Sequence, residues 1–419
     1  MAAPCGNSDL REKVLAWIEQ DRQRLVAFLA RLLQARSDNP PGITREAASV
    51  VQTLLSEEGL TCEFFNARDD MPNIASSFDM EAPGSHLVLN GHLDVFPIEE
   101  TEPWTHGPWS GAVAGGRIWG RGAVDMKSGT TASIFAFIYM NRLRVHLKGR
   151  LSLTVVSDEE MFSPYGAPYL LKMRPDLYGD CCLSGEPSGE AVVRFGERGR
   201  LWLRFTIRTP GAHAAYPYLS ASASRIGARL MLDLDELSRL EPSAPADVTS
   251  LLCKAVPAYE ETLGKGAGEI MQKVTVTAGT VHAGVKVNMV PASCVFEADI
   301  RLPVGLEKAD VLAAVDKIVA RYPEASYEEF GYHAPNWCDP GHPLAQRLIE
   351  NVSAVKRNVP VRAVGLGATD MRLWRGAGVP AFIFGPSPTM MGKRDENVTI
   401  DEFLDLVRIH ALTALDYLS

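Results

Sequence analysis

The sequence lacks the features that mark secreted and membrane-spanning proteins. Its seven cysteines are an odd number and include the adjacent pair Cys181 and Cys182, with no Cys-x-x-Cys spacing. This argues against a disulfide framework and against a thiolate zinc site. No run of about 18 apolar residues is present, and the N-terminus leads into a charged helix without the apolar core of a signal peptide. We therefore expect a cytoplasmic protein with no membrane partner.

Basic clusters are also missing. The 42 Lys and Arg residues are outnumbered by 51 Asp and Glu residues, and the formal net charge of −9 is spread without long runs of one sign. We therefore expect no nucleic-acid partner and a small-molecule substrate instead. The remaining composition, 46% hydrophobic and 22% charged over 419 residues, is typical of a globular protein that is long enough for two domains.

Residues 1–195 alternate between helical periodicity and short apolar runs that are typical of buried strands. The predicted helices cover residues 9–36, 44–59, 126–140 and 165–173, and the predicted strands cover 62–65, 86–90, 150–156 and 180–184. This alternation predicts an α/β fold in which helices flank a mostly parallel sheet.

Residues 196–333 have a different texture. Strand 201–207 is followed by helix 221–237, strands 273–278 and 293–302, helix 306–321 and an edge strand 325–330. This order matches an α+β ferredoxin-like unit. From 334 to 419 the α/β texture returns, with helix 343–355, strand 380–384 and helix 401–417. We expect residues 1–195 and 334–419 to form one catalytic domain, into which residues 196–333 are inserted.

Potential metal ligands follow the predicted strands or precede the helix at 126–140. In an open parallel sheet, the loops beyond the carboxyl ends of the strands form the ligand crevice, so these side chains are expected to converge. Imidazole nitrogen and carboxylate oxygen together suit Zn²⁺, Mn²⁺ or Co²⁺. In chain order the residues are His92, Asp125, Glu159, Glu160 and Glu186. Asp94, two residues after His92, can fix the tautomer of the His92 ring.

Such a set suits hydrolysis. A divalent cation with an open coordination position lowers the pKa of a bound water to about 7. A carboxylate that does not bind the cation can then act as general base, and the adjacent Glu159 and Glu160 can divide these two tasks. Each residue also has an ordinary structural interpretation, for example a helix cap at Asp125. Their shared position at strand ends favours the metal site.

Four segments resemble the superfamily of acetylornithine deacetylase, succinyl-diaminopimelate desuccinylase, aminoacylase and glutamate carboxypeptidase. They are residues 91–95, 120–129, 157–160 and 211–214. The resemblance implies a pair of metal ions bridged by Asp125, with His92 and Glu186 completing one site and Glu160 serving the other. It also implies that Glu159 is the general base and that Asp94 orients His92.

The same resemblance makes the inserted domain a lid that also mediates homodimer formation. His213 would reach a substrate carbonyl, in the active site of the partner subunit, and Asn288 and Arg301 would contact substrate. Two alternatives stay open: Arg301 can equally be a structural ion-pair partner, and His213 can be an ordinary loop residue.

One position departs from the superfamily pattern. The resemblance places a ligand histidine four residues before Glu396, and Gly392 stands there. We therefore expect one well-held ion at His92, Asp125 and Glu186, with Glu160 as a further ligand or as a weak second site. Asp395 could replace the missing ligand, although an aspartate in such a turn is more often solvated.

The leading hypothesis is a metal-dependent hydrolase that cleaves a C–N bond, amide or amine, of a small carboxylate-bearing substrate. Because a single ion suffices for an electron-poor substrate, an aromatic aminohydrolase is the alternative. It would act on an aminobenzoate, as does the similar 5-nitroanthranilate aminohydrolase. A second alternative is an inactive ligand-binding relative. The presence of both Glu159 and Glu160 argues against it, because a carrier needs no spare base.

Overall fold

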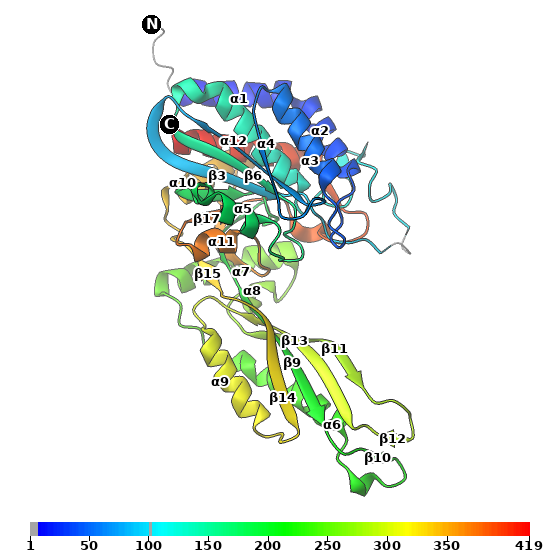
Figure 1. The fold of residues 1–419 in the computed structure, drawn as a ribbon. Helices are drawn as coiled ribbons and strands as arrows, with labels where there is room; N and C mark the ends of the chain where they lie inside the picture. Colours follow the sequence, from blue (N-terminus) through cyan, green and yellow to red (C-terminus); the bar gives the residue numbers. More distant parts are fainter. Residues whose placement is uncertain (1–6, 100–102) are drawn as a thin grey trace.

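The computed structural model describes residues 7–99 and 103–419, so the expectation about the extreme N-terminus concerns residues outside the described part. The chain forms a large α/β body and a smaller, elongated body that extends from it (Figure 1). Each body has its own cluster of buried apolar side chains. Among the described residues, no helix combines the length and the apolar character needed to cross a bilayer.

A nine-stranded sheet runs through the large body, in the order β1-β2-β6-β3-β7-β17-β8-β15, with β16 beside β8. Its centre is parallel, as predicted, and antiparallel strands extend it on both sides. The parallel strands are β3 (Ala82–His92), β6 (Lys148–Val156), β7 (Cys181–Ser184) and β17 (Ala381–Ile383). The others are β1 (Glu63–Asn66), β2 (Pro72–Asp79), β8 (Val192–Glu197), β15 (Asn336–Trp337) and β16 (Val361–Gly365).

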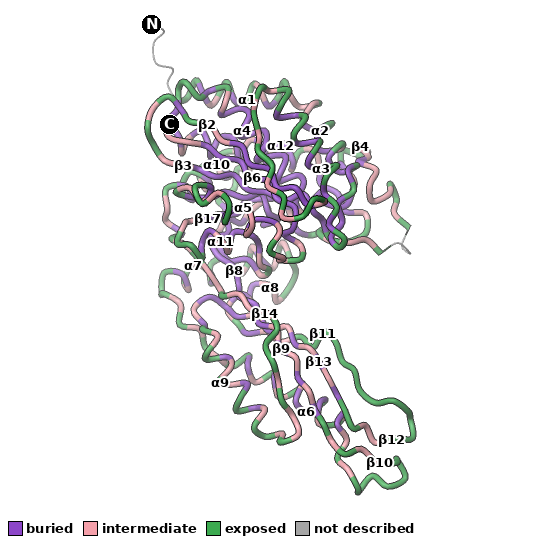
Figure 2. The backbone as a smooth tube through the Cα atoms, in the orientation of Figure 1, coloured by how far each residue is buried: buried purple, intermediate pink, exposed green. Residues whose placement is uncertain are grey.

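Helices cover this sheet, and α4 and α12 pack against each other over it. Their apolar side chains join those of β3 and β6 in one cluster, so the sheet centre is buried (Figure 2). The helices of the large body are α1 (Asn7–Gln20), α2 (Arg22–Gln34), α3 (Arg45–Glu57), α4 (Lys127–Leu143), α5 (Ala167–Met173), α10 (Pro343–Lys356), α11 (Met371–Gly376) and α12 (Ile400–Leu418). A small three-stranded sheet joins β4 (Ala112–Ala114), β5 (Arg117–Trp119) and β18 (Asn397–Thr399).

The prediction of a single helix over residues 9–36 is wrong in one respect. The chain forms two helices that meet at Asp21, where ψ is 2° instead of the helical value of about −42°. The Asp21 carboxylate accepts hydrogen bonds from the Tyr139 hydroxyl at 3.1 Å and from Arg142 at 3.4 Å. These long-range contacts involve α4 and could not be read from the local periodicity.

The small body is a four-stranded antiparallel sheet in the order β11-β13-β9-β14, with α6 and α9 on one face. This order is that of a ferredoxin-like unit, as predicted. Its strands are β9 (Gly199–Arg208), β11 (Thr275–Ala283), β13 (Ser293–Leu302) and β14 (Ala325–His333), and its helices are α6 (Ala223–Asp233) and α9 (Lys308–Val319). The far tip carries a two-stranded pair, β10 (Ala212–His213) and β12 (Met289–Val290) (Figure 1).

No element was predicted for residues 238–272, yet they form helices α7 (Ala246–Leu263) and α8 (Ala267–Ile270). The buried side chains of α7 belong to the apolar cluster of the large body. Tyr259 anchors the helix there, because its hydroxyl donates to the carbonyl oxygen of Val364 at 2.5 Å. The interval 196–333 therefore contributes residues to both cores.

Candidate metal centre

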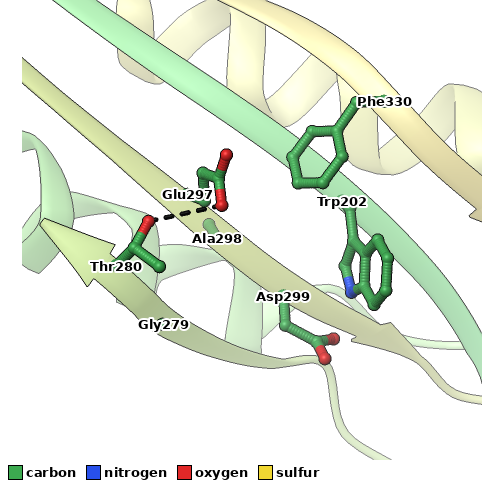
Figure 3. Close-up of a pocket in the computed structure, with 7 residues that line it drawn as sticks. All are labelled: Trp202, Gly279, Thr280, Glu297, Ala298, Asp299 and Phe330. Atoms are coloured by element: carbon green, nitrogen blue, oxygen red, sulfur yellow. Dashed lines mark hydrogen bonds between the residues drawn. The ribbon is translucent and has the colours of Figure 1, made fainter. Parts of the chain in front are cut away.

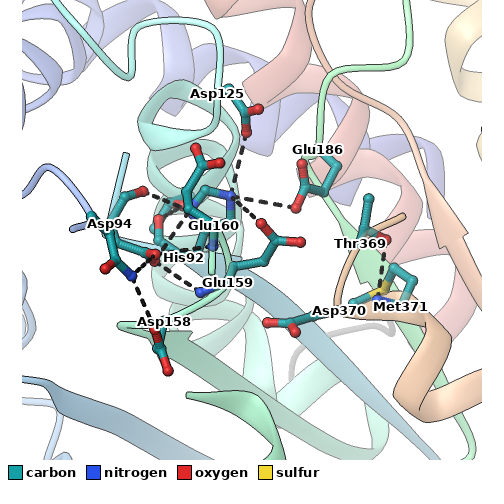
Figure 4. A network of polar contacts seen from close by, with 12 residues as sticks. His92, Asp94, Asp125, Asp158, Glu159, Glu160, Glu186, Thr369, Asp370 and Met371 are labelled. Carbon is teal, nitrogen blue, oxygen red and sulfur yellow. Dashed lines mark hydrogen bonds and ion pairs between the residues drawn. The ribbon is translucent and has the colours of Figure 1, made fainter. Parts of the chain in front are cut away.

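The predicted metal ligands and the predicted base meet at the carboxyl ends of β3, β6 and β7 (Figure 4). His92 is the last residue of β3, Glu159 and Glu160 follow β6, and Glu186 follows β7, while Asp125 comes from the loop before α4. Two overlapping groups have ligand atoms within 4.8 Å of one another: His92, Glu159 and Glu186, and His92, Asp125 and Glu160. Residues from four loops are thus brought together as the strand-end argument required.

His92 lies at the centre of this arrangement and is 1% exposed. Its Nε2 atom is 3.3 Å from Oδ1 of Asp125, 3.5 Å from Oε1 of Glu186 and 3.9 Å from Oε2 of Glu159. Its Nδ1 atom is 2.8 Å from the main-chain carbonyl oxygen of Asp94. Because a carbonyl can only accept, Nδ1 carries a hydrogen, and Nε2 is the ring atom that would bind a cation through its lone pair.

The residues present fit a divalent cation. Four buried atoms of the predicted site residues have no hydrogen-bond partner: Nε2 of His92, Oδ1 of Asp125, Oε1 of Glu159 and Oε1 of Glu160. An unpartnered buried polar atom costs free energy, and several acceptors that face one another repel. A cation among them would satisfy the lone pairs of the residues that bind it, and nitrogen with carboxylate oxygen is a donor set that Zn²⁺ and Mn²⁺ accept.

The pKa values of the acidic side chains point the same way. Burial, followed by the charge of Asp125, raises the pKa of Glu186 to about 7. Burial and the charge of Glu186 raise the pKa of Glu159 well above its ordinary value, and burial and Asp125 do the same for Glu160. For His92, burial lowers the pKa, but the carboxylates of Asp125 and Glu186 outweigh it and raise the pKa well above 6.5. Without a cation, the repulsion between these carboxylates is relieved by the uptake of protons.

Asp94 has two roles that belong to different parts of the residue. Its main-chain carbonyl orients His92, and its carboxylate accepts from the main-chain N–H groups of Glu159 at 3.2 Å and Glu160 at 3.0 Å. The carboxylate also accepts from the side-chain amide of Asn39 at 2.9 Å, and the same amide donates to Asp158 at 3.0 Å. The expectation that Asp94 orients His92 therefore applies to its backbone, while the carboxylate holds the loop of the two glutamates.

Two glycines allow helix α4 to approach the loop of Glu186. A Cβ atom on Gly129 would lie 2.1 Å from the carbonyl oxygen of Gly185, and one on Gly185 would lie 2.4 Å from the Cα atom of Gly129. Neither contact is tolerable for a side chain. Both positions therefore require glycine, and the close approach sets Glu186 beside the end of β3.

Glu396 holds the loop that carries Asp125. It is fully buried, and Oε1 accepts from the main-chain N–H groups of Val124 at 2.9 Å and Asp125 at 3.2 Å, while Oε2 forms an ion pair with Arg121 at 2.6 Å. Burial raises its pKa to about 7, against the opposing effect of Arg121. In the sequence, Glu396 served only as a reference point for the missing histidine, and its role in positioning Asp125 was not predicted.

The region of the missing histidine offers no replacement ligand from Asp395. Its carboxylate accepts from the main-chain N–H of Thr105 at 2.7 Å and from the Thr105 hydroxyl at 2.9 Å, and Asp395 is in neither ligand group. The suggestion that Asp395 rescues a second site is therefore not supported by this geometry. Gly392 itself has a φ of 68°, in the region that favours glycine.

Asp370 was missed by the sequence reasoning. It precedes α11 in the glycine-containing turn after β16, and its carboxylate lies beside Glu159 in Figure 4. It is buried, Oδ2 has no hydrogen-bond partner, and burial raises its pKa to about 6 against the charge of Arg372. The strand-end argument does not cover this residue, because β16 is parallel to β8 and therefore antiparallel to β17 and the other parallel strands.

The residues expected to contact substrate lie on the small body. His213 in β10 and Asn288 next to β12 are exposed at its far tip, away from the metal centre (Figure 1). Arg301 is near the other end of β13, where it forms two hydrogen bonds with Asp299 at 2.7 and 2.8 Å. The structure therefore joins Arg301 to an ion pair and does not bring His213 or Asn288 to the metal centre of the same chain.

Comparison with known proteins agrees with this geometry. Residues 88–416 match the model of peptidase family M20/M25/M40. A succinyl-diaminopimelate desuccinylase from Cereibacter sphaeroides is 28% identical over 393 residues, which cover 90% of this chain and 96% of that protein. A metallo-carboxypeptidase of the M20 family from Sulfolobus solfataricus has a similar fold, with a TM-score of 0.79 at 17% identity over 94% of this chain and 99% of that chain. Human carnosine dipeptidase 1 has a TM-score of 0.76 at 14% identity over 99% of both chains.

Proposed function

Because the chain belongs to peptidase family M20/M25/M40 and is therefore a metal-dependent hydrolase, we propose that it cleaves a C–N bond of a small carboxylate-bearing substrate, with Glu159 as general base. The observation that carries the proposal is the environment of His92 Nε2. Its lone pair faces carboxylate oxygens of Asp125, Glu186 and Glu159 at 3.3 to 3.9 Å. At neutral pH a bound cation makes this arrangement favourable, because its charge replaces the protons that the cluster otherwise takes up.

A divalent cation, when bound at this site, supplies positive charge that polarises a carbonyl group and makes water more acidic. Mn²⁺, Zn²⁺ and Co²⁺ all suit the donor set. His92, Asp125 and Glu186 would hold the cation most firmly, and Glu160 would be a further ligand or serve a weaker second site. The absence of histidine at position 392 favours one tightly held ion per chain.

Glu159 is suited to move the proton. It is buried next to Glu186 and Asp370, and both burial and these charges raise its pKa, so that its carboxylate is a stronger base than an exposed glutamate. Its main chain is fixed by the Asp94 carboxylate. We propose that Glu159 accepts the proton of the attacking water and then gives it to the nitrogen of the leaving amine, so that the C–N bond breaks without releasing an anionic amide.

The substrate class follows from the relatives and remains part of the proposal. The relative from Cereibacter sphaeroides is named as a desuccinylase, and the two fold neighbours described above are a metallo-carboxypeptidase and a dipeptidase. We propose an N-acyl amino acid or a short peptide as the substrate. An aminobenzoate belongs in any test, because the position occupied by Gly392 leaves the aromatic aminohydrolase alternative open.

The small body is proposed to act in trans. His213 and Asn288 are at its exposed tip, where large apolar side chains are also exposed: Tyr216, Tyr218, Leu219, Val285 and Val287. In a homodimer this tip would enter the metal centre of the partner subunit and act as its lid. Mixing His213→Ala chains with Glu159→Gln chains tests this, because a mixed dimer would regain one intact active site only if the tip works across the interface.

The function is tested by turnover of a panel of N-acyl amino acids, dipeptides and aminobenzoates with Mn²⁺ or Zn²⁺. We expect release of an amino acid by the metal-loaded protein and none after metal removal. Full activity of the stripped protein would contradict the proposal. Release of ammonia from an aminobenzoate would select the aromatic aminohydrolase, and ligand binding without turnover by the metal-loaded protein would select the inactive relative.

A further inference from the structure

Three side chains that can donate hydrogen bonds to an anion form a row across the small sheet. Arg200 in β9 is the register partner of Arg301 in β13 and of His333 in β14, so all three lie on the same face. This is the face without helices, because the next residue, Leu201, belongs to the apolar cluster under α6 and α9. The row is at the end of the sheet where the chain crosses from the large body, directly after β8.

Arg372 reaches the same place from the large body. Its Cζ atom is 4.7 Å from the centroid of the Phe162 ring, and Cζ of Arg200 is 4.8 Å from the same centroid. Phe162 is two residues after Glu160, on the loop of the proposed base. The charge of Glu159 also contributes to the pKa of Arg200, which it raises against the stronger effect of burial. The cationic row and the metal centre are therefore neighbours.

Arg200 has no acidic partner of its own among the described residues. It is 8% exposed, it forms no ion pair within 4.0 Å, and its Nε atom is buried without a hydrogen-bond partner. Burial, with the nearby charges of Arg301 and Arg372, lowers its pKa to about 10, so it stays charged at neutral pH. Arg301 is compensated by Asp299 at 2.7 Å, and Arg372 lies 3.5 Å from Asp370. The uncompensated charge is thus that of Arg200.

His333 is a second unpartnered group in this place. Both of its ring nitrogens are buried without a hydrogen bond. Burial and the charges of Arg200, Arg372 and Arg301 lower its pKa to about 3, so the ring is neutral and has one N–H to donate. A buried guanidinium without a counterion and a buried imidazole without a partner are both costly.

We propose that Arg200, together with Arg372 and His333, binds a carboxylate of the substrate beside the metal centre, and that this subsite selects acyl compounds with an additional negative charge. A planar carboxylate matches the fork of a guanidinium group, and it would supply the counterion that Arg200 lacks. The inference rests on the proposed hydrolase function, because the carboxylate would belong to the same molecule whose scissile bond lies at the metal centre.

Trp202 stacks on Arg200 and orients its guanidinium group. Cζ of Arg200 is 3.6 Å from the centroid of the Trp202 ring, a stacking contact that holds the guanidinium plane in place. On the same sheet face, Trp202 and Phe330 line an open hollow of about 240 Å³ with Asp299 at its edge (Figure 3). Glu297 and Asp299 border the hollow, and their negative charges would repel an anion there. The anion would therefore bind at the free edge of the Arg200 guanidinium group.

The test is a calorimetric titration of the metal-loaded full-length protein with succinate and with succinamate, in which one carboxylate of succinate is replaced by an amide. The variant is Arg200→Met, which keeps an unbranched side chain without charge. The matched control is Arg204→Met on the same strand and face, because Arg204 is half-buried and already paired with Glu297 and Glu328. Bound metal is measured in every protein.

We expect the wild-type protein to bind succinate at least about tenfold more tightly than succinamate, and Arg200→Met to remove most of this difference with unchanged metal content. Arg204→Met should behave as wild type. Equal binding of the two ligands by the wild-type protein would overturn the proposal even if Arg200→Met does not fold. Equal succinate affinity in wild type and Arg200→Met would overturn it too, since the carboxylate would then lie on the metal alone.

Two further arms separate related explanations. Inorganic phosphate that binds more tightly than succinate in an Arg200-dependent manner would overturn the carboxylate assignment and indicate a phosphate site. Succinate binding that depends on Arg200, without turnover of any N-acyl compound, would reject the hydrolase function and keep the subsite. Turnover that is unchanged in Arg200→Met for both N-succinyl and N-butyryl amino acids would keep the hydrolase function and reject the subsite.

Discussion

His92 is oriented by the main chain of Asp94, through a hydrogen bond of 2.8 Å from Nδ1 to the Asp94 carbonyl oxygen. The Asp94 carboxylate is farther from the ring, at 3.6 Å from Nδ1, and accepts instead from the N–H groups of Glu159 and Glu160. One residue thus fixes both the nitrogen ligand and the loop of the proposed base, and the two effects can be separated by changing only the side chain.

Asp94→Asn should lower turnover more than metal affinity. The substitution keeps the carbonyl group that orients His92, but it replaces one accepting oxygen by an NH₂ group that cannot accept from Glu159 or Glu160. We expect turnover to fall on the order of 10 to 100-fold, with a smaller change in metal affinity measured by competition with a chelator. Asp79→Asn, on an exposed strand end, is the control. Equal losses in both quantities would mean that the carboxylate acts mainly on His92.

The adjacent glutamates should respond differently to the same change. Glu159→Gln removes the proton acceptor, and we expect turnover to fall at least about 10²-fold while metal content stays at the wild-type level. Glu160→Gln removes a negative charge beside Asp125, and we expect it to weaken metal binding. Metal analysis together with single-turnover rates distinguishes them. If Glu160→Gln kept its metal and Glu159→Gln lost it, the roles assigned to the two residues would be exchanged.

A histidine can be tested at the position where the superfamily pattern expects one. A Cβ atom on Gly392 would meet only Cδ1 of Phe96, at 3.8 Å, so a side chain has room, although its φ of 68° makes any substitution cost about 1 kcal/mol. Gly392→His and Gly392→Ala should therefore lose similar stability in thermal unfolding. We expect only the histidine variant to move from near one to near two tightly bound ions per chain. Identical metal content in the two variants would show that this loop cannot deliver a ligand to the centre.

The sequence predicted the site better than its surroundings, and the reason is topological. Parallel strands have their carboxyl ends at one edge of a sheet, so placing His92 and Glu186 after apolar runs was enough to bring them together. The four strands and two helices of the small body were likewise predicted, the strands from alternating apolar residues and the helices from helical periodicity. Long-range contacts left no such pattern. Helix α7 packs on the large body through Tyr259 and Val364, which are 105 residues apart.

The same limit applies to the groups that position the site. Glu396 accepts a hydrogen bond from the main chain of Asp125, which is 271 residues away in the sequence. Arg200 of the small body and Arg372 of the large body both contact the ring of Phe162. In the sequence each of these is an ordinary charged residue. Its importance becomes visible only in the structure, where it is buried against residues that are distant in the chain. Residues of this kind follow from the tertiary structure, because their partners are chosen by the packing of whole elements.

His410 gives a pH-dependent property that is independent of the metal centre. It is fully buried in α12, and Nε2 is 2.8 Å from the carbonyl oxygen of Phe384. Burial lowers its pKa to about 4, so the folded protein holds it neutral, whereas an unfolded chain binds a proton near pH 6.5. As the pH falls from 6.5 towards 4, the unfolded state takes up one more proton than the folded state at this residue. The free energy of unfolding therefore decreases with falling pH, by on the order of 3 kcal/mol in total.

His410→Gln should remove this contribution, because its side-chain amide can still donate to Phe384 but does not titrate. We expect the free energy of unfolding, measured by urea denaturation between pH 7 and 4, to decrease less steeply in the variant than in the wild-type protein, by up to about 1.4 kcal/mol per pH unit. Other buried groups titrate in the same range, and they affect both proteins alike, so the difference between the two curves isolates His410. His146→Gln, at an exposed position, should leave the curve parallel to that of the wild type. A parallel curve for His410→Gln as well would mean that the folded protein accommodates the imidazolium, and that burial in α12 does not hold this ring in its neutral form.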